Sequence, residues 1–305
     1  MDPRRILVTG AAGFVGRHLL VALRDRFPHA AVIHSPFDVT DQPAVARGVA
    51  VARPDAVVHL AGVAAPVEAR REPDRAWQVN LHGTLNLARA VLDAVPDCVL
   101  LFASSADAYG ASFRAGVPVD EAAPLAPLNT YGATKAAADL ALGAMAAEGL
   151  RCVRVRPFNH TGPGQHPAFV VAAFAQQVAR VAAGLQPPVL EVGALEPERD
   201  FLDVRDVCAA YASVLARADA LAPGMILNVA SGSARRIGDI LHELLDTAGV
   251  RAEVRTDAAR LRPADIPVAR GDAGLARRLL DWAPRIPWRQ TLADVLEDWR
   301  RRVRA

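Results

Sequence analysis

Three glycines, Gly10, Gly13 and Gly16, follow a short apolar run near the start of the chain and open a helical pattern. Glycine allows the backbone to turn tightly and to approach a pyrophosphate, while the N-terminus of the following helix presents aligned N–H groups. A glycine-rich turn in this place predicts a dinucleotide site, although the spacing is G-x-x-G-x-x-G and not the more familiar G-x-G-x-x-G. The residues expected to bind the cofactor here are Gly10, Gly13, Phe14, Val15 and Gly16.

The first half of the chain alternates apolar β-type runs with helical patterns. Strands are expected at 6–8, 31–33, 57–60, 99–103 and 152–155, and helices near 14–26, 41–52, 74–94 and 131–148. This alternation predicts an α/β fold with a Rossmann-like doubly wound parallel sheet and helices on both of its faces.

The pattern changes after Pro157, where glycine and proline cluster and helices mix with short strands around 189–192 and 226–229. We expect an NAD(P)-binding domain over 1–156 and a smaller mixed α/β substrate-binding lobe over 157–305. Some segments of that lobe are expected to return to the first domain.

Composition narrows the class of protein. With 52% hydrophobic and 22% charged residues, the chain can bury a full core, and its net charge of +2 gives no indication of a nucleic-acid partner. Cys98, Cys152 and Cys208 are far apart in apolar or helical runs, which favours reduced core residues over a disulfide or a metal site. No cleavable signal and no long uncharged apolar span is visible, so we expect a cytoplasmic protein without a membrane partner.

The chain contains a single lysine, Lys135, among 35 lysines and arginines. Arginine replaces lysine on a surface at little cost, so a lone lysine suggests a task that needs a compact ammonium. Tyr131 lies four residues earlier, and on a helix the two side chains share one face. A cation beside a phenol lowers its pKa from about 10, which makes Tyr131 a candidate proton donor or acceptor for an alcohol–ketone pair. The alternative is an ordinary tyrosine and lysine on a helix surface.

The end of the second predicted strand, His34-Ser35-Pro36, lacks the carboxylate that usually binds the ribose of NAD. Without an acid a 2′-phosphate is not repelled, and without an arginine it is not strongly held. The expected cofactor is therefore NADP(H) or NAD(H), with a mild preference for NADPH.

Several motifs, in the same order along the chain, resemble those of the extended short-chain dehydrogenase/reductases, which act on nucleotide-diphosphate sugars. They are the glycine turn, Asp38-Val39, His59-Leu-Ala-Gly62, Asn80, Ser104-Ser105 before Tyr109-Gly110, and Tyr131-x-x-x-Lys135. The resemblance covers essentially the whole chain.

The resemblance implies a role for each matching position. Ser105 holds the substrate carbonyl, Tyr131 is the acid/base, and Lys135 binds the nicotinamide ribose and tunes Tyr131. Asn80 bends its helix. The cofactor contacts implied in this way are Asp38, Val39, Leu60, Ala61, Tyr131 and Lys135.

Three motifs of the second lobe resemble one branch of the family, the GDP-4-dehydro-6-deoxy-D-mannose reductases. They span 158–165, 199–206 and 260–267. The resemblance implies that Asn159 lies at the sugar and that Arg199 and Arg262 bind the diphosphate, which suits the fork geometry of guanidinium.

Other residues of these motifs have structural alternatives. Asp203 and Asp206 are candidates for turn and helix-cap residues. His160 and Gln165 either stabilise their loop or touch the ligand.

The loop after Ser105 departs from the sugar 4,6-dehydratases of the family. Those enzymes place Thr, Asp and Glu in succession, whereas Ala106 here replaces the first acid and only Asp107 remains. One carboxylate does not easily serve as both acid and base, so water elimination is disfavoured. Asp107 either hydrogen-bonds a sugar hydroxyl of the substrate or is a turn residue that faces solvent.

The motifs favour NAD(P)H-dependent reduction of the C4 ketone of a nucleotide-diphosphate 6-deoxy-4-keto sugar, with a GDP-sugar as the favoured partner. The reaction implied is GDP-4-dehydro-6-deoxy-D-mannose to GDP-D-rhamnose. An NAD-dependent nucleotide-sugar 4-epimerase remains an alternative, as does a non-catalytic nucleotide-binding scaffold. The intact set of Ser105, Tyr131 and Lys135 argues against a scaffold. Neither the C4 stereochemistry of the product nor the base of the nucleotide is fixed by the sequence.

The helix pattern at 131–148 carries small residues over most of its surface. Small side chains allow a second helix to approach closely. We therefore expect a homodimer built on helices 74–94 and 131–148, as is common in the family.

Overall fold

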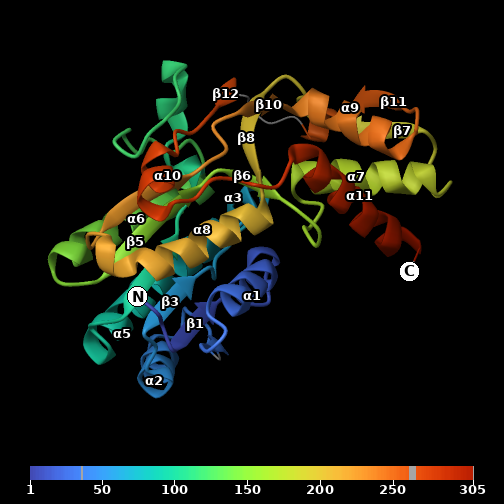
Figure 1. Cartoon of the computed structure of the whole chain (residues 1–305). Coiled ribbons are helices and arrows are strands. Elements are labelled where there is room, and N and C mark those ends of the chain that lie inside the picture. The colour runs from blue at the N-terminus through green and yellow to red at the C-terminus, as the bar shows by residue number, and fades with distance from the viewer. Residues whose placement is uncertain (36, 261–265, 305) are drawn as a thin grey trace.

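A six-stranded parallel sheet forms the centre of the larger lobe (Figure 1). The computed structural model describes residues 1–35, 37–260 and 266–304. The strand order is β2-β1-β3-β4-β5-β9, and every neighbouring pair is parallel. The strands are β1 Arg5–Thr9, β2 Ala31–His34, β3 Ala56–His59, β4 Val99–Ala103, β5 Cys152–Pro157 and β9 Met225–Val229.

Helices cover both faces of this sheet, so its central strands β3 and β4 are buried almost throughout and their apolar residues do not alternate with polar ones. On one face the core is formed with α1 Phe14–Arg26, α8 Val204–Arg217 and α10 Gly274–Leu280. These helices contribute the buried side chains of Leu19, Leu215 and Leu280, respectively. The core on the other face is formed by α2 Gln42–Ala52, α5 Thr84–Ala94 and α6 Thr130–Ala147. The predicted doubly wound fold is confirmed.

The helix expected at 74–94 is present, but it contains a π-helical turn that the sequence did not predict. The segment begins with α4 Pro73–Trp77, continues as the π-turn over Gln78–Gly83, and ends as α5; α3 Pro66–Arg71 precedes it. A π-turn inserts one residue into the helical repeat, and such turns often lie at functional sites. Apolar periodicity does not reveal it, because the contacts that hold it come from other elements.

The second lobe is organised around β8 Glu198–Asp203. This strand pairs with β10 Ala234–Arg236 (antiparallel), and with β12 Val268–Ala269 and β6 Asn159–Thr161 (both parallel). A separate core holds α7 Val170–Ala182, α9 Ile237–Ala248 and α11 Trp288–Arg304 against the parallel pair β7 Val189–Val192 and β11 Glu253–Thr256. Figure 1 shows these elements gathered at one end of the molecule, at a distance from β1 and α2.

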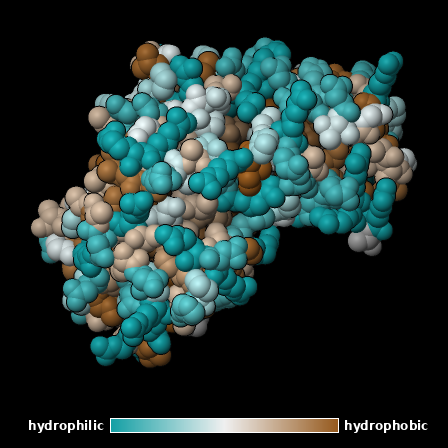
Figure 2. Space-filling model, in the orientation of Figure 1, coloured by the Kyte–Doolittle hydropathy of each residue, from teal (hydrophilic) through white to brown (hydrophobic). Residues whose placement is uncertain are grey.

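The remaining regular elements are short 3₁₀ turns at Ala106–Ala108, Gly110–Ala115, Ala218–Ala220 and Ala258–Arg260. Cys98, Cys152 and Cys208 are buried free thiols, as predicted. Within the described ranges, no helix is long and apolar enough to cross a membrane. Apolar residues on the face shown in Figure 2 are scattered among hydrophilic ones.

Candidate active site

The turn before α1 is packed so closely against neighbouring backbone that it requires glycine. Gly10 has φ +70°, and a Cβ there would meet the backbone nitrogen of Ala61 at 2.7 Å. A Cβ at Gly16 would collide with the carbonyl oxygens of Gly10 and Ala11. Gly13 is the N-cap of α1 and no side chain caps the helix, so its first N–H groups are available to an anion. These residues fit the pyrophosphate of a dinucleotide cofactor.

A buried polar chain joins this turn to the end of β3. Thr9 Oγ1 lies 2.7 Å from His59 Nδ1, and His59 Nε2 lies 2.9 Å from Thr84 Oγ1. Burial lowers the pKa of His59 to about 3, so the ring is neutral. Thr9 Oγ1 also accepts from the N–H of Ala61 at 3.2 Å, which fixes the Leu60-Ala61 backbone beside the glycine turn.

Asp38 and Val39 form a turn at the edge of the same region. The Asp38 carboxylate accepts from the backbone N–H and the hydroxyl of Thr40, both at 2.9 Å, and these bonds lower its pKa. Val39 is buried, and its carbonyl accepts from Asn86 Nδ2 at 3.0 Å. The side chain of Asp38 is thus used by its own turn, and the predicted cofactor contacts of these two residues stay predictions.

Ser105, Tyr131 and Lys135 come from two elements that meet at the carboxyl end of β4. Ser105 follows this strand and is hydrogen-bonded to Tyr131, which lies in the first turn of α6. Lys135 lies one turn further on, and its Nζ donates to the carbonyl of Ala103 at 2.8 Å. An ammonium has three donors, so this bond orients Lys135 and leaves donors for a ribose.

The expectation that Lys135 lowers the pKa of Tyr131 is wrong. Burial raises the pKa of the Tyr131 phenol, the charge of Asp107 raises it further, and the hydrogen bond with Ser105 opposes these effects. Burial also lowers the pKa of Lys135 to about 8, although Asp139 raises it. For both Tyr131 and Lys135, loss of solvent disfavours the charged form more than the attraction between ammonium and phenolate, expected from the four-residue spacing, favours it. Tyr131 is therefore a protonated phenol at neutral pH.

The π-turn holds Asn80 beside the catalytic helix. Asn80 Oδ1 accepts from the N–H of Val63 at 2.8 Å, and Asn80 Nδ2 donates to the carbonyl of Val63 at 3.1 Å and to Thr134 Oγ1 at 2.9 Å. Thr134 Oγ1 in turn donates to the carbonyl of Tyr131 at 2.8 Å. Asn80 therefore ties the loop after β3 to the first turn of α6.

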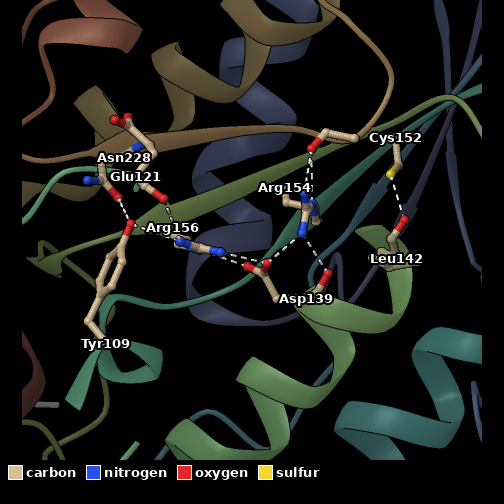
Figure 3. Close-up of polar contacts among 9 residues, drawn as sticks. Tyr109, Glu121, Asp139, Leu142, Cys152, Arg154, Arg156 and Asn228 are labelled. Carbon is tan, nitrogen blue, oxygen red and sulfur yellow. Dashed lines mark hydrogen bonds and ion pairs between the residues drawn. The ribbon is translucent and has the colours of Figure 1, made fainter. Parts of the chain in front are cut away.

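A second buried network anchors α6 from its other side (Figure 3). Asp139, one turn after Lys135, has no exposed surface and accepts from Arg156 Nε at 2.9 Å, Arg156 Nη2 at 2.8 Å and Arg154 Nη1 at 3.1 Å. Arg156 also donates to the hydroxyl of Tyr109, which follows the Ser105 loop, at 3.0 Å. The sequence analysis did not find this network, although the position of Asp139 four residues after Lys135 was a signal.

The network continues to β9 at the edge of the large sheet. Tyr109 Oη donates to Asn228 Oδ1 at 2.8 Å, and Asn228 Nδ2 donates to the carbonyls of Val119 and Asp272. Burial raises the pKa of Tyr109 to about 12, which keeps its hydroxyl a donor at neutral pH. One connected set of polar bonds thus fixes α6, the Ser105 loop and β9 relative to one another.

The predicted substrate residues lie on or near the second-lobe sheet. Asn159 is exposed at the start of β6, and Arg199 is half-buried in β8. Burial lowers the pKa of Arg199, and the charge of Asp107 opposes that effect. Because Asp107 acts on both Tyr131 and Arg199, β8 lies within electrostatic range of the catalytic loop. Arg262 lies outside the described residues.

The other second-lobe residues have structural partners. Asp203 caps α8 through the N–H of Arg205, and Asp206 accepts from the N–H groups of Arg285 and Ile286. Gln165 Oε1 accepts from Thr161 Oγ1, and Gln165 Nε2 donates to the carbonyl of His160. The ring of His160 stacks on Phe14 of α1, with centroids 6.3 Å apart, so this loop packs directly against the helix that follows the glycine turn.

The fold, the glycine turn and the Ser–Tyr–Lys set define an NAD(P)-dependent oxidoreductase of the extended short-chain dehydrogenase/reductase type. Residues 6–230 match the NAD dependent epimerase/dehydratase family, and the chain belongs to it. It is 40% identical over 304 residues to a GDP-6-deoxy-D-mannose reductase from Pseudomonas aeruginosa, with 99% of each chain covered.

Solved structures agree with this assignment. The structure of RMD from Pseudomonas aeruginosa complexed with NADPH matches with a TM-score of 0.90 and 37% identity, covering 98% of this chain and 99% of that one. The UDP-glucose 4-epimerase of Thermus thermophilus in complex with NAD matches with a TM-score of 0.84 and 29% identity, covering 97% and 99%. The predicted family and the predicted cofactor class, NADP(H) or NAD(H), are confirmed.

Proposed function

We propose that this enzyme reduces the C4 ketone of GDP-4-dehydro-6-deoxy-D-mannose to give GDP-D-rhamnose, with NADPH or NADH as the reductant. The observation that carries the proposal is the 40% identity, over 99% of both chains, to a GDP-6-deoxy-D-mannose reductase. The intact set of Ser105, Tyr131 and Lys135 supports it, since a reductase needs each of them.

The reduced nicotinamide, when bound, supplies the hydride to the ketone carbon. Ser105 donates a hydrogen bond to the ketone oxygen, and Tyr131 delivers its proton to the oxygen as negative charge develops there. Lys135, held by the carbonyl of Ala103, binds the nicotinamide ribose. The raised pKa of Tyr131 keeps the phenol protonated until negative charge develops on the ketone oxygen.

A 4-epimerase is the alternative function, because it would use the same Ser105, Tyr131 and Lys135. Cofactor content after purification separates the two functions: an epimerase retains tightly bound NAD, and we expect an exchangeable site here.

We assign the sugar and diphosphate contacts to residues of both lobes. Asn159 and Asp107 contact the sugar, and Arg199 and Arg262 bind the diphosphate. The acceptors of Arg199 Nη1 are the backbone carbonyls of Glu198 and Pro267, at 2.7 and 3.4 Å, so its positive charge is not neutralised by them. A diphosphate supplies the matching charge.

A homodimer and a cytoplasmic location complete the proposal. The outer side of α6 carries Ala133, Ala137, Leu140 and Ala144, and the side chain of Leu140 is 61% exposed. These positions form one apolar stripe at helical spacing, and a second copy of α6 covers it closely. A monomer by light scattering at micromolar concentration contradicts this interface.

The direct test is incubation of the enzyme with GDP-4-dehydro-6-deoxy-D-mannose and either NADPH or NADH, followed by identification of the sugar by NMR. GDP-D-rhamnose supports the proposal. GDP-6-deoxy-D-talose corrects the stereochemistry, and absence of turnover with either cofactor defeats the assigned reaction.

A further inference from the structure

Two arginines lie directly opposite each other on the second-lobe sheet. In the antiparallel pair β8–β10, Arg235 is the partner of Arg199. Opposite residues of an antiparallel pair project from the same face of the sheet with Cβ atoms about 4.5–5.5 Å apart. Like charges in this arrangement repel, so a protein that keeps them together needs a compensating negative charge.

The described part of the protein supplies this charge only in part. The charge of Asp107 acts on Arg199, but among the described residues no carboxylate forms an ion pair with Arg199 or Arg235. Arg235 Nε is buried without a hydrogen-bond acceptor. The next residue of the strand, Arg236, points to the other face and pairs with Glu196 and Asp239. The same strand therefore holds one neutralised arginine and, within the described ranges, one unneutralised arginine.

A second buried donor lies beside the first. The guanidinium carbon of Arg235 is 4.8 Å from the centre of the Trp288 ring, and Trp288 Nε1 is also buried without an acceptor in the described part of the chain. The stacking holds the guanidinium in one plane. Trp288 in turn packs on Phe201, which lies on the same face of β8 as Arg199. The face thus carries charged and polar donors from three elements, and two of these donors have no acceptor among the described residues.

We infer that Arg235 binds the diphosphate of the nucleotide sugar together with Arg199, and that Trp288 holds Arg235 in place. This inference rests on the proposed function, because it extends the same substrate site. Phosphate oxygens are acceptors with negative charge, which is what two opposed guanidinium groups lack. The charge of Asp107 acts on both Arg199 and Tyr131, so Arg199 lies within electrostatic range of the catalytic loop.

The test measures binding of GDP, guanosine and NADPH to the full-length enzyme by calorimetry, in Arg235→Ala and Arg235→Lys variants. We expect Arg235→Ala to weaken GDP binding roughly tenfold or more, the scale of a hydrogen bond to a charged group. Affinity for NADPH should not change, and Arg235→Lys should recover part of the loss because it restores the charge without the fork. Any binding of guanosine should not differ between the variants.

Arg236→Ala is the matched control, since it removes an arginine from the same strand but from the opposite face. Unchanged GDP affinity in Arg235→Ala overturns the inference, as does an equal loss in Arg236→Ala or an equal loss for NADPH. If the stack on Trp288 is purely structural, Arg235→Ala should lose affinity for GDP and NADPH equally and should have a lower melting temperature. If the wild type neither binds GDP nor reduces the GDP-sugar, the proposed function fails. If the wild type does both and Arg235→Ala binds GDP with wild-type affinity, only the inference fails.

Discussion

Two pairs of strand arginines in this molecule have opposite surroundings. Arg154 and Arg156 of β5 converge on Asp139, and their nitrogens also reach the carbonyl of Gly224 and the hydroxyl of Tyr109. Arg199 and Arg235 of the second-lobe sheet converge on no carboxylate among the described residues. The first pair has the partners that a buried charge needs for stability, whereas the second pair is arranged for a charge that arrives with a ligand.

The comparison distinguishes residues that stabilise the fold from residues that contact substrate. The largest expected effect on activity without an effect on stability is at Tyr131. Tyr131→Phe keeps the ring and removes the proton donor. We expect turnover to fall by about 10²–10⁴-fold, the usual range for general acid–base catalysis, with melting temperature and NADPH affinity nearly unchanged. Wild-type turnover by this variant removes Tyr131 from the mechanism.

Asp139→Ala should mainly reduce stability, in contrast to Tyr131→Phe, which should mainly reduce turnover. It leaves Arg154 and Arg156 buried without their carboxylate, and breaking a buried pair in this way costs about 3–5 kcal/mol of stability. Urea unfolding of the ligand-free protein measures the loss. Glu253→Ala is the control, because it breaks the exposed Glu253–Arg255 pair and should change little. Equal effects of the two substitutions contradict a stabilising role for the Asp139 network.

Arg199→Ala should weaken substrate binding without weakening the fold. We expect a loss of about 1.5–3 kcal/mol in sugar binding, seen mainly in KM, because the diphosphate does not change charge during hydride transfer. The free energy of unfolding of the ligand-free enzyme should stay the same or rise, since an uncompensated cation is removed. Arg156→Ala is the counterpart and should unfold more readily. A large loss of stability in Arg199→Ala means that the two pairs do not differ as described.

Lys135 lies between the two groups, because it is buried and the charge of Asp139 favours its charged form. Its pKa is about 8 in the folded enzyme against an ordinary 10.5. Between these values the unfolded chain binds a proton that the folded chain does not, so stability rises with pH. The slope contributed is about 1.4 kcal/mol per pH unit. The stability of the wild type relative to Lys135→Met should therefore increase from pH 8 toward pH 10.5 in urea unfolding, and a constant difference contradicts the shift.

Strands of the large sheet were predictable because β-type runs buried on both faces leave a clear pattern. The predicted run at 99–103 matches β4, and the other four predictions lie within two residues of the observed ends. The glycine turn and the Ser–Tyr–Lys set were visible for a similar reason, since each is a local spacing. The second-lobe strands β6, β10 and β12 have only two or three residues, which is too short for a period to appear.

What the sequence did not reveal depends on distant partners. The π-turn at Asn80 is held by Val63 and Thr134, and the Asp139 network by two arginines of another strand. The pKa of Tyr131 was misjudged because spacing shows a neighbouring cation but not the burial that outweighs it. The sequence did not distinguish Arg235 from the other 33 arginines, because only the register of β8 and β10 places it opposite Arg199.

The return of β9 to the large sheet has a consequence for recombining enzymes of this family. Residues after 157 supply the edge strand β9 and the covering helices α8 and α10, whose side chains Val207, Leu227 and Leu280 are fully or almost fully buried in the core of the large lobe. A chimera that exchanges everything after 157 therefore replaces part of the cofactor domain as well as the substrate lobe. A gene fragment ending there exposes an apolar sheet face and an unpaired strand edge. Exchange of substrate specificity between relatives therefore needs grafts that keep α8, β9 and α10 from the parent.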